Sequence, residues 1–115
     1  MWDNALVALL RSLHGRAKTA IVSNAWPNMR TRITEAGLTG VVDEVVLSCV
    51  VGYAKPDARI YTVALERLTA GPGDVLFIDD AHGNVTAAEA LGMTGHLHTG
   101  NAGTIARIED FLIDD

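Results

Sequence analysis

The chain has 115 residues, of which 49% are hydrophobic and 20% are charged, and it carries a formal net charge of −5. This profile is typical of one globular domain over residues 1–115, and the negative charge with scattered basic residues argues against nucleic acid as a partner. No apolar run approaches the roughly 20 residues of a membrane-spanning helix and no signal-peptide pattern opens the chain, so we expect a cytoplasmic protein without a membrane partner.

Helices and short apolar strands alternate along the sequence. In chain order we expect a helix at 3–15, a strand at 18–23, a helix at 27–37, a strand at 45–51, a helix at 58–68, a strand at 75–78, a helix from 83 or 84 to 92, a strand at 94–98 and a helix at 104–112. This alternation implies right-handed crossovers and a parallel sheet, hence an α/β fold. The one cysteine, Cys49, lies in the apolar run of the second strand, where a buried and inert thiol is expected.

The third predicted strand ends in two adjacent carboxylates, Asp79 and Asp80. Neighbouring carboxylates repel each other unless a cation or a proton offsets their charge. The pair therefore indicates either a metal site or a strand end that reaches water, where both acids are hydrated.

Polar side chains also follow the first two strands. Ser23 and Asn24 end the first strand, and Lys55 lies in the loop after the second. Taken singly, Ser23 could cap a helix and Lys55 could face solvent. Because the carboxyl ends of parallel strands meet at one edge of a sheet, however, we expect these groups to lie near the two acids. A hydroxyl, an amide and an ammonium group suit phosphoryl oxygens, and carboxylates suit a hard cation such as Mg²⁺.

Three segments together resemble the haloacid dehalogenase-like (HAD) hydrolase superfamily: AIVSNA, GYAKPDARIY and VLFIDDAHGNVTAAEALGM. The resemblance extends from about Leu6 to Leu112. It is closest to the phosphatase branch related to the N-terminal domain of soluble epoxide hydrolases, and it implies a Rossmann-like three-layer core. True haloacid dehalogenases usually carry small polar residues in place of Asp79 and Asp80, so dehalogenation is disfavoured.

By this resemblance, six residues have roles at the site: Ser23, Asn24, Lys55, Asp79, Asp80 and Asn84. Ser23 and Asn24 contact the phosphoryl group, and Lys55 stabilises that group and the nucleophile, which makes Lys55 and Ser23 the expected catalytic side chains. Asp80 ligates Mg²⁺, Asp79 supports the metal indirectly, by contacting its ligands or through water, and Asn84 lines the same site. The implied substrate is a small phosphorylated metabolite.

The sequence departs from the family at the first motif, which carries the nucleophile. Members attack phosphorus with an aspartate of a DxD motif at the end of the first strand, whereas the only acid before Ser23 is Asp3 and no DxD pattern occurs. The helical cap that usually follows is also absent. Ser23 is a poor replacement because no base accompanies it, and His82 is expected to be a surface histidine. The resemblance therefore implies a partial core that lacks its first strand and its cap, with only weak Mg²⁺ binding.

Two functions of different classes follow. The first is a Mg²⁺-dependent phosphatase core, a fragment or an inactive chain unless the missing nucleophile strand is supplied. The alternative is a non-catalytic module that binds phosphate or metal, or another protein. A phosphate-accepting receiver domain is a third reading, but there the acids come first and the lysine last.

The missing strand also has a structural consequence. In the family it lies between the strand ending at Ser23 and the strand ending at Asp79. Without it, these two strands either pair directly or each keep an unpaired edge. Because unpaired edges favour association with another chain, a homodimer or a complementing chain is expected.

Overall fold

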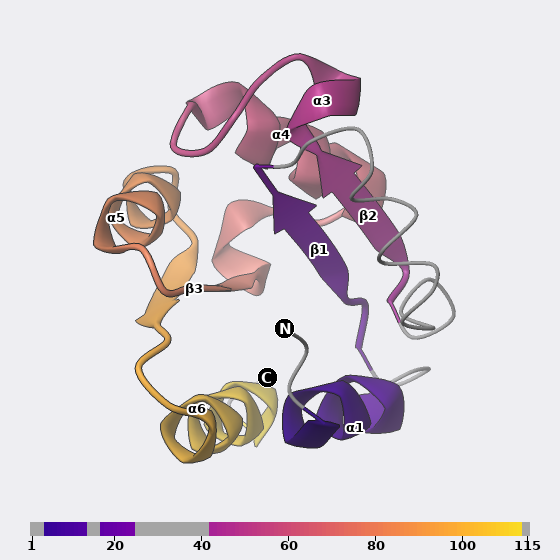
Figure 1. Ribbon diagram of the computed structural model, residues 1–115, viewed down its shortest axis with the longest axis vertical. Helices are drawn as coiled ribbons and strands as arrows, with labels where there is room; N and C mark the ends of the chain where they lie inside the picture. The colour runs from indigo at the N-terminus through magenta and orange to yellow at the C-terminus, as the bar shows by residue number, and fades with distance from the viewer. Residues whose placement is uncertain (1–3, 14–16, 25–41, 114–115) are drawn as a thin grey trace. The chain divides into compact units, whose positions relative to one another are not determined.

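The computed structural model describes residues 4–13, 17–24 and 42–113, and these belong to two compact units, Met1–Thr69 and Ala70–Asp115 (Figure 1). Each unit contains two parallel strands with helices packed against them, so the expected α/β architecture is confirmed. The helix expected at 27–37 lies outside the described residues, and the organisation of residues 1–115 as one domain stays a prediction. None of the described helices has the length and apolar character needed to cross a membrane.

The first unit contains, in chain order, α1 (Asn4–Leu13), β1 (Ala20–Ser23), β2 (Glu44–Leu47), α3 (Ser48–Val51) and α4 (Ala58–Leu68). Strands β1 and β2 pair in parallel, and the last pair of the register is Ser23 with Leu47. Helix α4 packs against both strands. The side chains of Ile60 and Tyr61 on α4 and of Val46 on β2 are almost completely buried, because the apolar face of the helix covers the sheet.

Helix α4 has partners at both of its ends. The Asp57 carboxylate accepts the backbone N–H of Arg59 at 2.9 Å and caps the N-terminus. At the C-terminus, Nζ of Lys18 donates to the carbonyl of Leu68 at 2.9 Å. A helix leaves its terminal N–H and C=O groups without internal partners, so these two bonds fix the bounds of α4 at the residues predicted from the sequence.

The strand predicted over residues 45–51 is wrong in its second half. The chain leaves the sheet after Leu47, and Ser48–Val51 form the helical turn α3, which Gly52 ends with a φ of 87°. The apolar run could not reveal this change, because a short continuous run fits a buried strand and a helix equally well. The turn exposes Cys49, so the expectation of a buried thiol is also wrong.

The second unit contains, in chain order, the short 3-10 helix η2 (Pro72–Asp74), β3 (Leu76–Asp79), α5 (His82–Ala90), β4 (Thr94–Leu97) and α6 (Asn101–Ile113). Strands β3 and β4 pair in parallel, α5 packs against both, and α6 contacts β3. The buried apolar side chains of this unit are Val85, Ala88, Met93 and Ile108. Helix α6 begins three residues earlier than predicted.

Each sheet has two strands within the described part of the chain, with β1 bonded to β2 and β3 bonded to β4. Because β1 and β3 lie in different units, the two arrangements expected for a core without its first strand, direct pairing of these strands or an unpaired edge on each, stay predictions.

Candidate functional site

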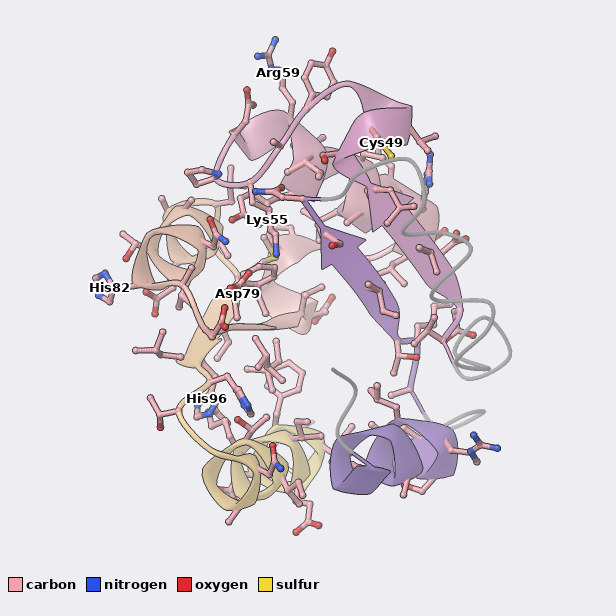
Figure 2. All side chains as sticks on the ribbon, in the orientation of Figure 1. Cys49, Lys55, Arg59, Asp79, His82 and His96 are labelled. Carbon is pink, nitrogen blue, oxygen red and sulfur yellow. The ribbon has the colours of Figure 1, made fainter. Side chains whose placement is uncertain are left out.

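The residues predicted to bind phosphate lie in the first unit, at the carboxyl end of its sheet. Ser23 is the last residue of β1 and is half-buried, and Asn24 follows it. Lys55 lies in the loop between α3 and α4 and precedes Pro56 through a cis peptide bond (Figure 2). The structure thus brings the ends of the two segments that carry Ser23 and Lys55 to one edge of one sheet.

Asn24 connects these two segments directly. Its Nδ2 donates to the carbonyl of Lys55 at 2.9 Å, and its Oδ1 accepts the backbone N–H of Lys55 at 2.7 Å. The strand pattern predicts both residues at one edge of the sheet, but it does not predict this pair of bonds, because the two residues are 31 positions apart. One hydrogen of Nδ2 remains for a phosphoryl oxygen, so the predicted phosphate contact of Asn24 stays a prediction.

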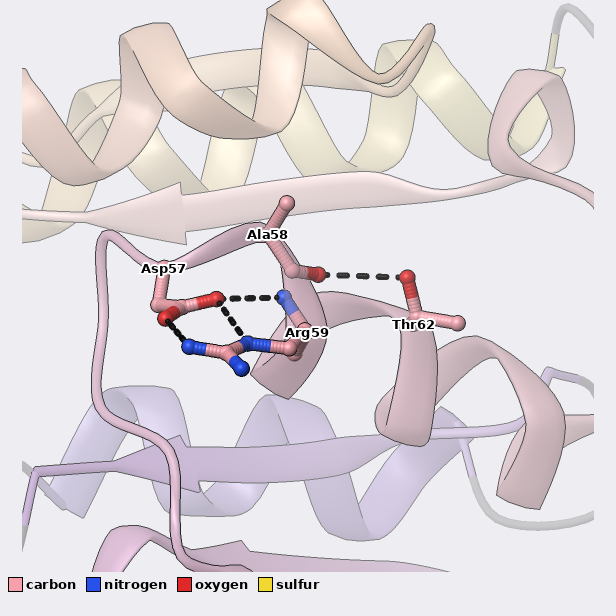
Figure 3. Close-up of polar contacts among 4 residues, drawn as sticks. All are labelled: Asp57, Ala58, Arg59 and Thr62. Carbon is pink, nitrogen blue, oxygen red and sulfur yellow. Dashed lines mark hydrogen bonds and ion pairs between the residues drawn. The ribbon is translucent and has the colours of Figure 1, made fainter.

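An ion pair follows Lys55 at the start of α4 (Figure 3). Nη2 of Arg59 donates to the Asp57 carboxylate at 2.7 Å and Nε donates at 3.1 Å, while the guanidinium lies 4.3 Å from the ring centre of Tyr53. The side-chain hydrogen bond from Arg59 lowers the pKa of Asp57 from 3.8 to about 2. Asp57 is ionised at neutral pH and forms an ion pair with Arg59. The two side chains together therefore add no net charge to the loop that carries Lys55.

The predicted metal-binding acids lie in the second unit, at the end of β3. Both carboxylate oxygens of Asp79 are bonded within the protein: Oδ1 accepts the N–H of Ala81 at 2.9 Å, and Oδ2 accepts Nδ2 of Asn84 at 3.1 Å. Asp80 is exposed, and no hydrogen bond or ion pair of its side chain is found among the described residues. The two neighbouring acids are therefore different in kind, one oriented by the protein and one presented to solvent.

Asn84 and His82 lie in the first turn of α5. Asn84 was expected to line the site, and its bond to Asp79 places it against one of the two acids. His82 is exposed and points away from the helix (Figure 2), as expected for a surface histidine.

Sequence reasoning missed one polar cluster. The hydroxyl of Thr104, which is 1% exposed on α6, lies 3.1 Å from Nε2 of His96 and 2.6 Å from Nδ1 of His98. The only sequence signal was the spacing of two histidines by two residues at the end of a strand, which places them on one face of the sheet. The cluster attaches the end of β4 to α6.

The two units differ in charge. Residues 1–69 contain eight Lys and Arg against six Asp and Glu, whereas residues 70–115 contain one Arg against eight acids. The predicted phosphate-binding groups therefore belong to the weakly basic unit, and the predicted metal-binding acids belong to the strongly acidic one. The net negative charge of the second unit attracts cations in general.

The donors fit Mg²⁺ only partly. Carboxylate oxygens are the hard ligands that Mg²⁺ prefers, and the ion commonly keeps several waters. Within the described ranges, no group of three or more His, Cys, Asp and Glu side chains could hold a metal. Asp80 as the direct carboxylate ligand, with Asp79 beside it, therefore suits an ion that is held weakly.

Comparison with known proteins places these features in a family. The sequence model of the haloacid dehalogenase-like hydrolases matches residues 1–92. Bifunctional epoxide hydrolase 2 of Mus musculus is 32% identical over 96 residues, which cover 79% of this chain and 17% of that protein. The sesquiterpene phosphatase astK of Aspergillus oryzae is 31% identical over 98 residues, which cover 81% of this chain and 48% of that protein. The chain thus spans less than half of either relative.

The fold of this chain is also similar to solved structures of HAD family enzymes. A HAD family enzyme of Bacteroides thetaiotaomicron, solved in complex with magnesium and inorganic phosphate, matches with a TM-score of 0.80 over 90% of this chain and 57% of that one. At 19% sequence identity this likeness concerns the fold alone. It confirms the Rossmann-like α/β core that the sequence predicted.

Proposed function

The chain belongs to the haloacid dehalogenase-like hydrolase family, and we propose that it is the core of a Mg²⁺-dependent phosphatase acting on a small phosphorylated metabolite. The observation that carries the proposal is the difference between the two acids at the end of β3: Asp79 is held by two protein hydrogen bonds, and Asp80 is exposed. The similarity to a fungal phosphatase supports phosphoryl rather than dehalogenation chemistry.

Each side chain has a distinct part in the proposal. The hydroxyl of Ser23 and the remaining amide hydrogen of Asn24 donate to phosphoryl oxygens, and the ammonium of Lys55 offsets their charge. Asp80, supported by Asp79, would hold Mg²⁺, which when bound neutralises negative charge on the phosphoryl group.

The proposed turnover needs a carboxylate nucleophile that residues 1–115 do not offer in a DxD pattern. We propose that a complementing strand, from another segment or another chain, supplies it. Strands β1 and β3 each have one strand partner within the described residues, and an open edge accepts an added strand through backbone hydrogen bonds. A homodimer is a second way to cover these edges, and the sedimentation coefficient of the purified chain distinguishes it from a monomer.

A non-catalytic binding module is the second candidate, favoured by the same missing aspartate. Such a module would bind phosphate or Mg²⁺ through the same side chains and release no product. It requires no complementing strand.

The test measures turnover and binding on the same preparations. Release of nitrophenol from an aryl phosphate is followed with Mg²⁺ for the 115-residue chain, for Asp80→Asn and for Asp74→Asn, which removes another exposed acid of the same unit. Calorimetry measures Mg²⁺ binding in parallel. Turnover that Asp80→Asn abolishes and Asp74→Asn retains would contradict the binding module. Saturable Mg²⁺ binding through Asp80 without turnover would rule out catalysis by these residues alone, and equal Mg²⁺ binding by all three proteins would refute the metal site.

A further inference from the structure

We propose that Asn24 is a positioning residue that fixes the main chain of Lys55 at the end of β1, and that this is its principal role. The inference deepens the proposed function and rests on it for the role of Lys55. It assigns to the Asn24 amide a task other than the phosphoryl contact that the family resemblance implies.

The geometry of the contact supports this role. Oδ1 and Nδ2 of Asn24 are both bonded to one residue, at 2.7 Å to the N–H and at 2.9 Å to the carbonyl of Lys55. A side-chain amide that meets both main-chain groups of one residue replaces the peptide of a neighbouring strand, since it offers one donor and one acceptor side by side. Two simultaneous bonds fix both the position and the orientation of the Lys55 backbone.

The path of the chain explains why such a bond is needed. The ladder of β1 and β2 ends at the pair of Ser23 with Leu47, after which the chain leaves the sheet through α3. Residues 48–54 carry it away from the strand that aligned it, so backbone pairing alone no longer sets the position of Lys55. Asn24, one residue beyond the last pair, forms hydrogen bonds with the main chain of Lys55 where the chain returns to the edge of the sheet.

The chemistry of the amide restricts which residue can do this. An aspartate at position 24 would still accept from the N–H of Lys55 but would face its carbonyl with a second acceptor. An alanine would lose both bonds. Asn24→Asp therefore keeps one half of the contact and Asn24→Ala keeps neither, which gives two variants that differ in a single hydrogen bond.

The first measurement is hydrogen exchange of the Lys55 amide by NMR on the isotope-labelled chain. We expect Asn24→Ala to accelerate this exchange by roughly five- to tenfold, as for loss of one ordinary hydrogen bond, while the amides of β2 change little. Asn24→Asp should restore most of the protection. Thr62→Ala serves as the control, because it removes another exposed side-chain bond of the same unit, to the carbonyl of Ala58, without touching Lys55. Unchanged exchange at Lys55 in Asn24→Ala would overturn the proposal.

The second measurement titrates the wild-type chain with inorganic phosphate. A positioning role predicts that the resonances of the Lys55 side chain shift while the Lys55 amide stays protected, because the Asn24 amide keeps both of its bonds to the Lys55 main chain. A large shift at Asn24 Nδ2, together with loss of protection at the Lys55 amide, would show that the amide turns to the ligand and would contradict the proposal. If phosphate shifts neither residue, the proposed function fails at this site, whereas the exchange measurement still decides the role of Asn24.

Discussion

The side-chain amide of Asn84 donates to the Asp79 carboxylate at 3.1 Å and connects the first turn of α5 to the end of β3. The other carboxylate oxygen of Asp79 accepts the N–H of Ala81, and the backbone carbonyl of Asp79 accepts the N–H of His98. Asp79 is therefore part of the local architecture as well as of the acidic pair. Because of this double role, a change in the charge around Asp79 is expected to affect both the stability of the second unit and its binding of cations.

Replacing Asn84 by aspartate turns this contact into a repulsion. We expect Asn84→Asp to lower the free energy of unfolding by about 1–2 kcal/mol, because a donor is lost and a like charge faces Asp79. Added Mg²⁺ should recover part of the loss. Urea unfolding with and without Mg²⁺ measures both effects, and Thr86→Asp, which adds a charge on an exposed position of the same helix, is the control. Equal Mg²⁺ effects in the two variants would show that the acids do not act together.

The close approach of α5 to β4 depends on Gly95. A Cβ at this position would lie 2.7 Å from both Cγ of Glu89 and Cγ1 of Val85, so these side chains or the helix that carries them would have to shift. We expect Gly95→Ala to destabilise the second unit by about 1–3 kcal/mol in urea unfolding. Gly103→Ala is the matched control, since nothing lies within 4 Å of its Cβ and alanine favours helix α6 by up to about 1 kcal/mol. Equal stabilities would contradict this packing.

Features encoded within a few positions of the sequence could be predicted, whereas contacts between distant positions could not. The bounds of α4 were predicted correctly because a cap at Asp57 and the helical spacing of apolar residues are encoded within a few positions. The strand end at Ser23, and to within one residue the strand end at Asp79, followed from apolar runs that stop at polar residues. These features carried the family resemblance and the candidate site.

The rest could not be predicted because it depends on pairing in space. The bond of Asn24 to Lys55 spans 31 positions, and the strand pattern predicts that both residues lie at one edge of the sheet but not which of their atoms meet. The contact of His98 with Thr104 is shorter in sequence but requires a turn between β4 and α6 whose path the residues do not reveal. The end of β2 at Leu47 was missed because apolar residues continue through α3.

The exposed position of Cys49 leads to a direct chemical prediction. We expect the native chain to react with one equivalent of an aromatic disulfide reagent, at a rate within about tenfold of the unfolded chain, because an exposed thiol is accessible to it. A variant with its thiol elsewhere provides the contrast: Ala64→Cys in a Cys49→Ser background puts the thiol at a buried position of α4. That variant should react only after unfolding. Protection of Cys49 in the native chain would place it in the core after all.

The acid stability of the first unit depends on Asp57. The folded state lowers the pKa of Asp57 from 3.8 to about 2 through its hydrogen bond with Arg59, so it favours the ionised carboxylate. This contribution to stability is complete above the ordinary value of 3.8 and is lost as the pH falls through the folded value of about 2. The urea midpoint of the wild-type chain should therefore fall between these pH values more than that of Asp57→Asn, which keeps a capping oxygen but cannot ionise. Salt should reduce the difference, because the pair is exposed. NMR titration of the Asp57 carboxyl in Arg59→Gln supplies the control, where the pKa should return toward 3.8, and an unchanged low pKa there would contradict the assignment to Arg59.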